Sequence, residues 1–254
     1  MTVTPLFRGL FDDASVFPPG DLPLGEAVPA HHGHRLAWYA EAVGPFLCGA
    51  GRAGELAALR PEFPVALVLA PGTERFTPVP GLDVVGVEVA AAELPSGLPD
   101  GVVAALELPY GDLLFKQLDQ LVDTPHRAKF RTGGLAAEAF PTEAQLAAFL
   151  AGCAERGIPY KLTAGLHNAV RHTDPVTGFE HHGFLNVLLA AADPDHAADH
   201  LAERSGGRLA EVARQLTDTQ IATARRSFTA FGTCSIAEPL ADLAELGLLT
   251  REKS

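Results

Sequence analysis

The sequence has few cysteines and no long hydrophobic run. Its 254 residues include three cysteines, which are far apart and lack C-x-x-C spacing: Cys48, Cys153 and Cys234. We expect reduced thiols in a cytoplasmic protein. The apolar stretches are only strand-sized, so no membrane-spanning helix is expected. Residues 1–20 contain no basic region followed by an apolar stretch, so we do not expect them to form a signal peptide.

Positive charge is also scarce. There are 19 lysines and arginines against 31 aspartates and glutamates, which gives a formal net charge of −12 at pH 7 and a pI near 5.2. Because no run of basic residues offsets this charge, it repels phosphates, and we expect neither nucleic acid nor an anionic membrane as a partner. The sequence carries no interface signature, so a homo-oligomer is left open.

The alternation of apolar and amphipathic segments predicts repeated strand–loop–helix units. The predicted strands are 46–48, 65–69, 84–89, 102–108, 127–131, 160–163 and 228–232. The predicted helices are 35–43, 53–59, 110–122, 143–156, 183–192, 195–204, 209–217, 218–227 and 236–246. Continuous apolar strands separated by helices indicate a parallel sheet covered on both faces, either an eightfold barrel or an open doubly wound sheet.

The barrel is the favoured α/β fold. A length near 250 residues suits it, and polar residues gather at strand ends. Gly49, Gly51 and Gly54 lack the G-x-G-x-x-G spacing of a dinucleotide site. We expect a single (β/α)8 TIM-barrel-like domain over residues 1–254, with an N-terminal extension at about 1–34 and a long histidine-containing loop at about 165–183.

Lysine is rare, and two of the four lysines lie in apolar, strand-like segments. An amine, unlike a guanidinium, can lose its proton and attack a carbonyl. Side chains alternate along a strand, so Lys129 shares a face with Arg131, and Lys161 shares one with Thr163. Their separation of 32 residues predicts neighbouring strands with both amines near the carboxyl end of the barrel. Burial and a like charge would lower the pKa of one amine and make it a nucleophile.

Polar groups around these lysines suggest an anionic substrate. A guanidinium, backbone N–H groups and a hydroxyl could hold its phosphate or carboxylate: Arg131, Thr132, Gly133, Gly134 and Thr163. Glu88 and Glu107 lie in otherwise apolar strands, and a buried carboxylate needs a partner or a proton. Each glutamate is therefore either the counter-ion of a lysine or arginine or a catalytic acid or base. If the glutamates are counter-ions, the ion pairs would make the lysines structural.

A histidine-rich segment follows the second lysine strand. We expect His167 or Glu107 to move protons, and Arg171 to bind an anionic substrate group. Metal binding is the competing use of these histidines and of the strand carboxylates, but no H-E-x-x-H motif occurs and no metal ligand is assigned. Cys234 has no histidine next to it in the sequence, so a nucleophilic thiol is not expected.

Short motifs in these segments resemble the imine-forming barrel aldolases of the deoxyribose-phosphate aldolase type. One strand lysine precedes Thr-Gly-Gly, the next precedes Thr-Ala-Gly, and Phe-Gly-Thr-Cys-Ser at 231–235 leads into a helix. The resemblance implies an eightfold barrel, with Lys129 as the Schiff-base lysine and Lys161 as the supporting one, or the reverse. It also implies a phosphate site at Gly232 and Ser235. The stretch between residues 163 and 231 is longer than in that family.

The sequence therefore predicts a lyase or aldolase-like enzyme that acts on a small anionic carbonyl compound through a lysine imine, without a cofactor. Two alternatives are left open. One is a divalent-metal-dependent lyase, isomerase or hydrolase that uses barrel carboxylates and histidines. The other is a non-catalytic barrel that binds a metabolite and keeps its lysines in ion pairs.

Overall fold

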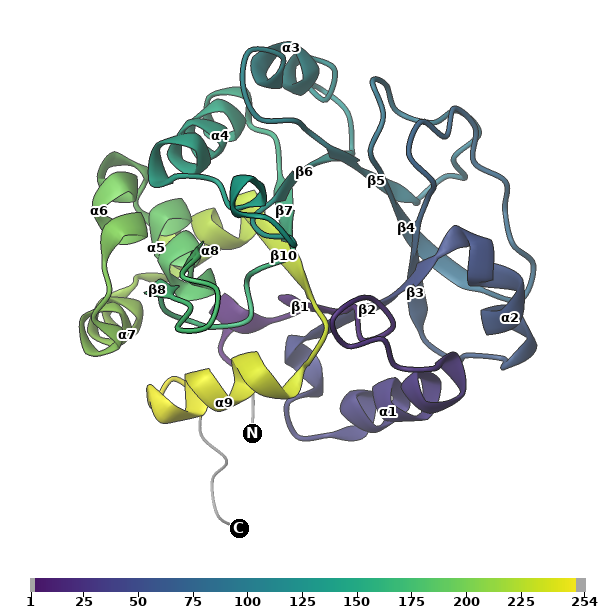
Figure 1. Ribbon diagram of the computed structural model, residues 1–254, viewed down its shortest axis with the longest axis horizontal. Helices are drawn as coiled ribbons and strands as arrows, with labels where there is room; N and C mark the ends of the chain where they lie inside the picture. Colours follow the sequence, from purple (N-terminus) through teal and green to yellow (C-terminus); the bar gives the residue numbers. More distant parts are fainter. Residues whose placement is uncertain (1–2, 250–254) are drawn as a thin grey trace.

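In the computed structural model, which describes residues 3–249, eight parallel strands close into a barrel (Figure 1). The order around the ring is β1-β10-β7-β6-β5-β4-β3-β2, so barrel strands that follow one another in the chain are neighbours. The strands are β1 Phe11–Asp13, β2 Val43–Gly49, β3 Pro64–Val68, β4 Asp83–Val89, β5 Val103–Glu107, β6 Arg127–Arg131, β7 Tyr160–Thr163 and β10 Phe228–Thr233. The predicted (β/α)8 TIM-barrel-like fold is confirmed.

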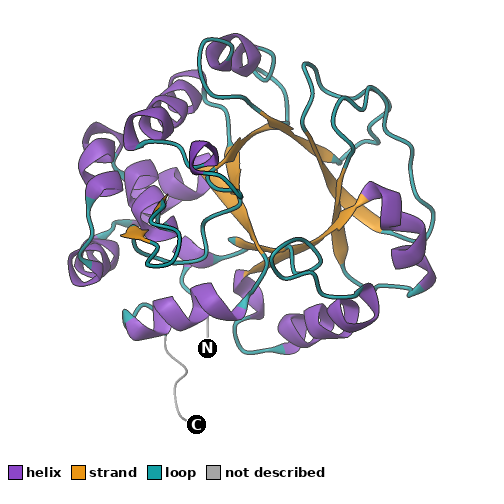
Figure 2. Ribbon diagram, viewed as in Figure 1, coloured by secondary structure: helices purple, strands orange, loops and turns teal. Residues whose placement is uncertain are grey.

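Helices cover the outside of most of the ring (Figure 2). They are α1 Leu24–Leu36, α2 Ala53–Ala58, α3 Leu114–Asp119, α4 Glu143–Arg156, α5 Phe184–Ala192, α6 Ala197–Ala202, α7 Gly206–Gln215, α8 Asp218–Ser227 and α9 Ala237–Glu245. Four elements have their predicted bounds: strands 127–131 and 160–163 and helices 143–156 and 218–227. The bounds of the other elements predicted after residue 43 differ from the prediction by a few residues. None of the helices described is long and apolar enough to cross a membrane.

The N-terminal segment differs most from expectation. Residues 1–34, expected to form an extension, contain β1, which pairs with both β2 and β10 and closes the ring, and most of α1. The predicted helix 35–43 is wrong, because α1 ends at Leu36 and only a short 3-10 turn, Ala40–Ala42, follows. Strand β1 has only three residues, two of them aspartates, and so lacks the apolar pattern that predicts a strand. Helix α1 contains Pro29, which lowers the helix propensity of its sequence.

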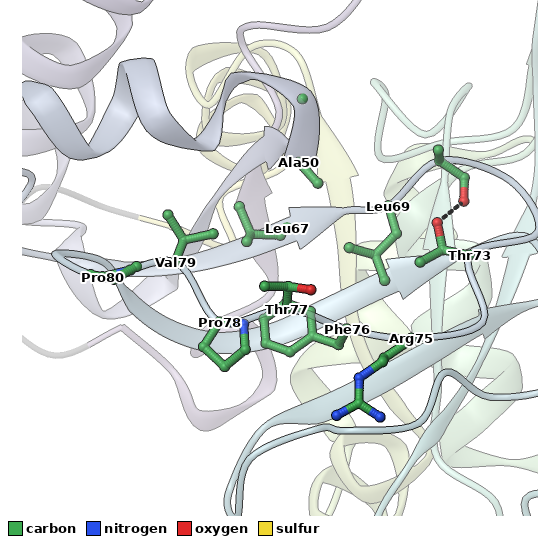
Figure 3. Close-up of a pocket in the computed structure, with 12 residues that line it drawn as sticks. Ala50, Leu67, Leu69, Thr73, Arg75, Phe76, Thr77, Pro78, Val79 and Pro80 are labelled. Atoms are coloured by element: carbon green, nitrogen blue, oxygen red, sulfur yellow. Dashed lines mark hydrogen bonds between the residues drawn. The ribbon is translucent and has the colours of Figure 1, made fainter.

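Within the described chain, no helix follows β3 or β4. Residues 69–82 and 90–102 run as loops, joined by a bridge between Arg75 and Ser96. The first loop folds around a cavity of about 410 Å³ on the outer face of β3, lined by Leu67, Leu69 and Phe76 among others (Figure 3). Loops therefore cover this side of the barrel in place of helices.

The apolar core lies between the strands and the helices that surround them. The ring of Phe11 packs edge-on against Phe184 of α5 and Phe231 of β10, with ring centroids 5.8 and 5.4 Å apart. Full burial of one such side chain contributes about 1.5–3 kcal/mol. The interior of the ring, in contrast, holds buried charged side chains: Asp12, Glu88, Lys129 and Lys161. The barrel therefore has an apolar outer layer and a polar interior.

Candidate active site

Strands β6 and β7 place two lysines side by side inside the ring. Lys129 and Lys161 are partners in the strand register, which confirms the prediction that their strands are neighbours. Alternation along each strand turns Phe130 and Leu162 toward the outer core and both lysines toward the interior. Each lysine has only 4% of its surface exposed. Ammonium groups buried to this extent require anionic partners.

Glu88 of β4 is shared between the two lysines. Its Oε2 lies 2.7 Å from Lys129 Nζ, and its Oε1 accepts a hydrogen bond from Lys161 Nζ. Lys129 Nζ also lies 2.9 Å from Glu107 Oε2 of β5, whose other oxygen accepts a hydrogen bond from Arg131 Nε at 3.1 Å. Both carboxylates are therefore counter-ions of a lysine, one of the two roles that the sequence leaves open.

Asp12 of β1 is a further member of this group. Lys161 Nζ donates a hydrogen bond to Asp12 Oδ2 at 2.5 Å, across 149 sequence positions. The neighbouring strand leaves room for the carboxylate because residue 44 is glycine, and a Cβ there would overlap Asp12 Oδ1. Asp13 points the opposite way, toward His31 of α1. We refer to the charged residues inside the ring as the lysine cluster: Asp12, Glu88, Glu107, Lys129 and Lys161.

The carboxylates hold Lys161 in its ammonium form. Burial alone would lower the pKa of Lys161, but the charges of Asp12 and Glu88 outweigh burial and raise it. Of the two lysines, Lys161 is therefore the one that remains an ammonium. Burial likewise opposes ionisation of Glu88, yet the two lysines lower its pKa to about 2. Burial raises the pKa of Asp12, because Lys161 offsets only part of the desolvation cost.

A cavity of about 580 Å³ lies over the lysine cluster, at the carboxyl ends of the strands. Glu88 and Lys129 form part of its wall, whereas Lys161 and Glu107 do not. Five other predicted site residues also line it: Arg131, Gly134, Thr163, His167 and Gly232. Barrel enzymes bind their substrates at this end of the strands.

Three predicted substrate-binding residues instead shape the loops around the cavity. The Thr132 hydroxyl donates a hydrogen bond to the Ala164 carbonyl oxygen. Gly133 packs so closely on Gly165 that a Cβ at 133 would lie 2.8 Å from the Gly165 Cα. Ser235 Oγ accepts a backbone N–H from the first turn of α9 at 3.4 Å. None of the three lines the cavity, and their predicted contact with substrate stays a prediction.

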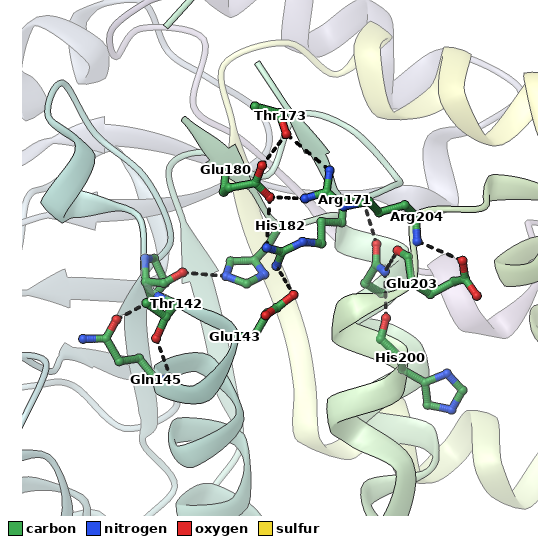
Figure 4. Close-up of polar contacts among 12 residues, drawn as sticks. Thr142, Glu143, Gln145, Arg171, Thr173, Glu180, His182, His200, Glu203 and Arg204 are labelled. Carbon is green, nitrogen blue, oxygen red and sulfur yellow. Dashed lines mark hydrogen bonds and ion pairs between the residues drawn. The ribbon is translucent and has the colours of Figure 1, made fainter. Parts of the chain in front are cut away.

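Arg171 is engaged away from the cavity (Figure 4). Its guanidinium pairs with Glu143 at the start of α4 and with Glu180 of the hairpin β8 His172–Thr173 and β9 Glu180–His181, both at 2.9 Å. Glu180 also pairs with Arg204. We refer to these four residues as the hairpin cluster. Arg171 does not line the cavity, and its predicted anion-binding role stays a prediction.

His167 lies in the cavity wall beside two residues from the last strand–helix unit. Its Nδ1 is 2.8 Å from Glu238 Oε2 and 3.7 Å from Cys234 Sγ. The thiol and the carboxylate raise the pKa of His167 to about 9, against the effect of burial. At neutral pH the ring is therefore a cation that can bind an anion or donate a proton, rather than a base. Sequence analysis missed the contact with Cys234 because 67 positions separate the two residues.

No three histidine, cysteine, aspartate or glutamate side chains among residues 3–249 are grouped so that they could hold a metal ion. Glu88 and Glu107, the ligands that a metal-dependent enzyme would need, contact lysines. Comparisons of the chain with protein-family models, with curated proteins and with solved structures found no match. The function therefore rests on the geometry of the cavity.

Proposed function

We propose that the protein is an aldolase-like lyase that breaks or forms a carbon–carbon bond in a small anionic carbonyl compound through a Schiff base on Lys129. One observation carries the proposal: Lys129 is a buried amine in the wall of a cavity, between two carboxylates and beside a second lysine. A buried amine with proton acceptors at hydrogen-bond distance has the groups that imine formation needs.

Lys161 suits the supporting role. It does not line the cavity, and Asp12 and Glu88 both accept hydrogen bonds from its ammonium group. The raised pKa keeps Lys161 charged at neutral pH. It therefore remains the partner of Glu88 when Lys129 gives up its charge.

We assign the proton transfers of imine formation to Glu107, which contacts Lys129 although it does not line the cavity. Its side chain is 18% exposed, against 3% for Glu88, and lies 2.9 Å from Lys129 Nζ. Glu107 takes a proton from the ammonium, the free amine attacks the carbonyl carbon, and the carboxylic acid returns the proton to the hydroxyl that leaves as water. Ammonium and carbonyl become iminium and water, with no net change in protons.

The iminium then acts as an electron sink. When the Glu107 carboxylate takes the proton of the β-hydroxyl of a bound substrate, the Cα–Cβ bond breaks, an aldehyde leaves and an enamine remains. Glu107 returns this proton to the enamine carbon, and addition of water releases the second carbonyl product and the lysine. Arg131 and the His167 imidazolium, in the same cavity wall, supply positive charge for the substrate's carboxylate or phosphate.

Borohydride trapping tests the proposal. The protein is treated with small aldehydes, keto acids and sugar phosphates in the presence of borohydride, and its intact mass is measured. We expect one adduct per chain with the cognate carbonyl, and none in Lys129→Arg, which keeps the charge facing Glu88 and Glu107 but offers no amine. The matched control Lys116→Arg, at an exposed lysine of α3, retains the adduct. An adduct that persists in Lys129→Arg, or no adduct with any carbonyl, contradicts the proposal.

The ion pairs favour one other function, a metabolite-binding barrel without catalysis. Each lysine ammonium has two carboxylate partners, and a buried paired charge is costly to break. This function predicts saturable binding of an anionic carbonyl compound in calorimetry, with no trapped adduct and no turnover. The same panel of compounds therefore separates the two functions.

A further inference from the structure

Cys234, His167 and Glu238 form a second group of reactive side chains at the cavity. Cys234 directly follows β10, Glu238 lies in the first turn of α9, and His167 lies in the loop after β7. Cys234 and His167 line the same cavity as Lys129. The imine steps proposed above leave the thiol without a role.

The thiol lies beside the imidazole ring rather than in line with one nitrogen. Cys234 Sγ is 3.7 Å from Nδ1 of His167 and 4.0 Å from Nε2. Glu238 Oε2 already engages Nδ1 at 2.8 Å. Nε2 has no partner besides the sulfur among residues 3–249. An oxygen two bonds away from Sγ can therefore reach hydrogen-bond distance of Nε2.

This geometry fits addition of the thiol to a carbonyl better than acyl transfer. An acyl-transfer triad places the thiol and the carboxylate on opposite ring nitrogens, so that the ring relays a proton between the thiol and the leaving group. Here the thiol is nearer to the nitrogen that Glu238 occupies. Addition to a carbonyl needs only a thiolate and one acid for the new oxygen. The His167 imidazolium supplies that acid.

The loop after β1 limits the size of a ligand at this position. Gly20 approaches so closely that a Cβ there would lie 3.1 Å from the Cβ of Cys234. Phe17, Pro18 and Pro19 of the same loop line the cavity. The space beside Cys234 therefore suits a small molecule.

We propose that Cys234 is a covalent binding site for small aldehydes, with the Nε2–H of His167 as the donor to the new hydroxyl oxygen. The Sγ–C bond forms while the π electrons of the carbonyl move to its oxygen. The Nε2 proton of the His167 imidazolium passes to that oxygen, and the thiol proton then takes its place on the ring. Thiol and aldehyde thus give a hemithioacetal, with nothing oxidised or reduced. The site does not depend on an imine at Lys129, although an aldehyde is one product of the proposed lyase reaction.

Carbon-13 NMR with acetaldehyde labelled at its carbonyl carbon tests this site. We expect a protein-bound hemithioacetal resonance in the wild type and in Lys129→Arg, and its loss in Cys234→Ser. Circular dichroism checks that each variant is folded. A resonance that persists in Cys234→Ser, one that disappears in Lys129→Arg, or no resonance in the wild type overturns the proposal. Borohydride trapping reports separately on the lysine, so failure of one proposal is distinguishable from failure of the other.

The role of His167 is tested by the rate at which acetaldehyde protects Cys234 from iodoacetamide. Loss of a general acid slows such a step by about 10²-fold or more, so His167→Gln should slow protection by that factor. His181→Gln is the matched control, because His181 also lines the cavity, whereas the histidine that the Cys234 sulfur contacts is His167. Equal rates in the two variants would contradict the role of His167.

Discussion

The lysine cluster and the hairpin cluster both pair carboxylates with basic side chains, lysines in the first and arginines in the second, and they differ in burial. In the lysine cluster, the side chains of Lys129 and Glu88 are 5% and 3% exposed. In the hairpin cluster, Arg204 and Glu180 are 49% and 42% exposed. Exposed pairs contribute about 0–1 kcal/mol, whereas loss of one partner from a buried pair costs about 3–5 kcal/mol. Burial beside a cavity, together with lysine in place of arginine, therefore distinguishes the candidate site from a structural network.

The largest effect on stability should come from Glu88→Gln. This change leaves two buried ammonium groups facing each other without their shared counter-ion. We expect a loss of about 3–5 kcal/mol in the free energy of unfolding, measured by urea denaturation at pH 7. A loss below about 1 kcal/mol would show that the two clusters do not differ in the way described.

The same carboxylate predicts a pH dependence. The pKa of Glu88 is about 2 in the folded protein, below its ordinary value of 4.5, so its ionisation stabilises the fold fully above pH 4.5. This contribution, about 3 kcal/mol, is lost as the pH falls toward 2. Urea denaturation at several pH values between 7 and 3 should show a steeper loss for the wild type than for Glu88→Gln. Parallel curves would assign the acid sensitivity to other groups.

Gly44→Ala should disturb the lysine cluster without changing a charge. The new Cβ would overlap Asp12 Oδ1, and overpacking of this kind costs about 1–3 kcal/mol. Gly49→Ala, in the same strand, is the control because no atom lies within 4 Å of the added Cβ. Thermal unfolding of both variants measures the difference. An equal effect of the two changes would mean that Asp12 can move at little cost.

The smallest effect should come from the hairpin cluster. Glu180→Gln removes the exposed partner of Arg171 and Arg204, and we expect a loss of no more than about 1 kcal/mol, reduced further by salt. Denaturation at low and high ionic strength measures this change. A loss as large as that of Glu88→Gln would place the hairpin cluster among the buried networks.

The sequence predicts the barrel and the neighbouring lysines because both depend on regular spacing. A separation of 32 residues matches one strand–helix–strand repeat, and the register pairs Lys129 with Lys161 as expected. The sequence does not predict the place of Asp12 in the lysine cluster, because β1 has only three residues and carries two aspartates. The charges of that strand become favourable only when the ring closes and Lys161, 149 positions away, pairs with Asp12.

The roles of Arg171 and Cys234 also depend on contacts that local patterns do not contain. Arg131 and Arg171 are the same residue type and both contact carboxylates, but only Arg131 lines the cavity. Cys234 has no histidine neighbour in the sequence, yet the loop after β7 brings His167 to within 3.7 Å of its sulfur. Long-range packing determines which of these side chains reaches the cavity.

Peptide mapping of the borohydride-trapped protein tests the central claim most directly, because it identifies the lysine that forms the imine. The account predicts that the modified peptide carries the adduct on Lys129, with Lys161 and the exposed Lys116 unmodified. Modification of Lys161 in place of Lys129, or of Lys116 to the same extent, would contradict it.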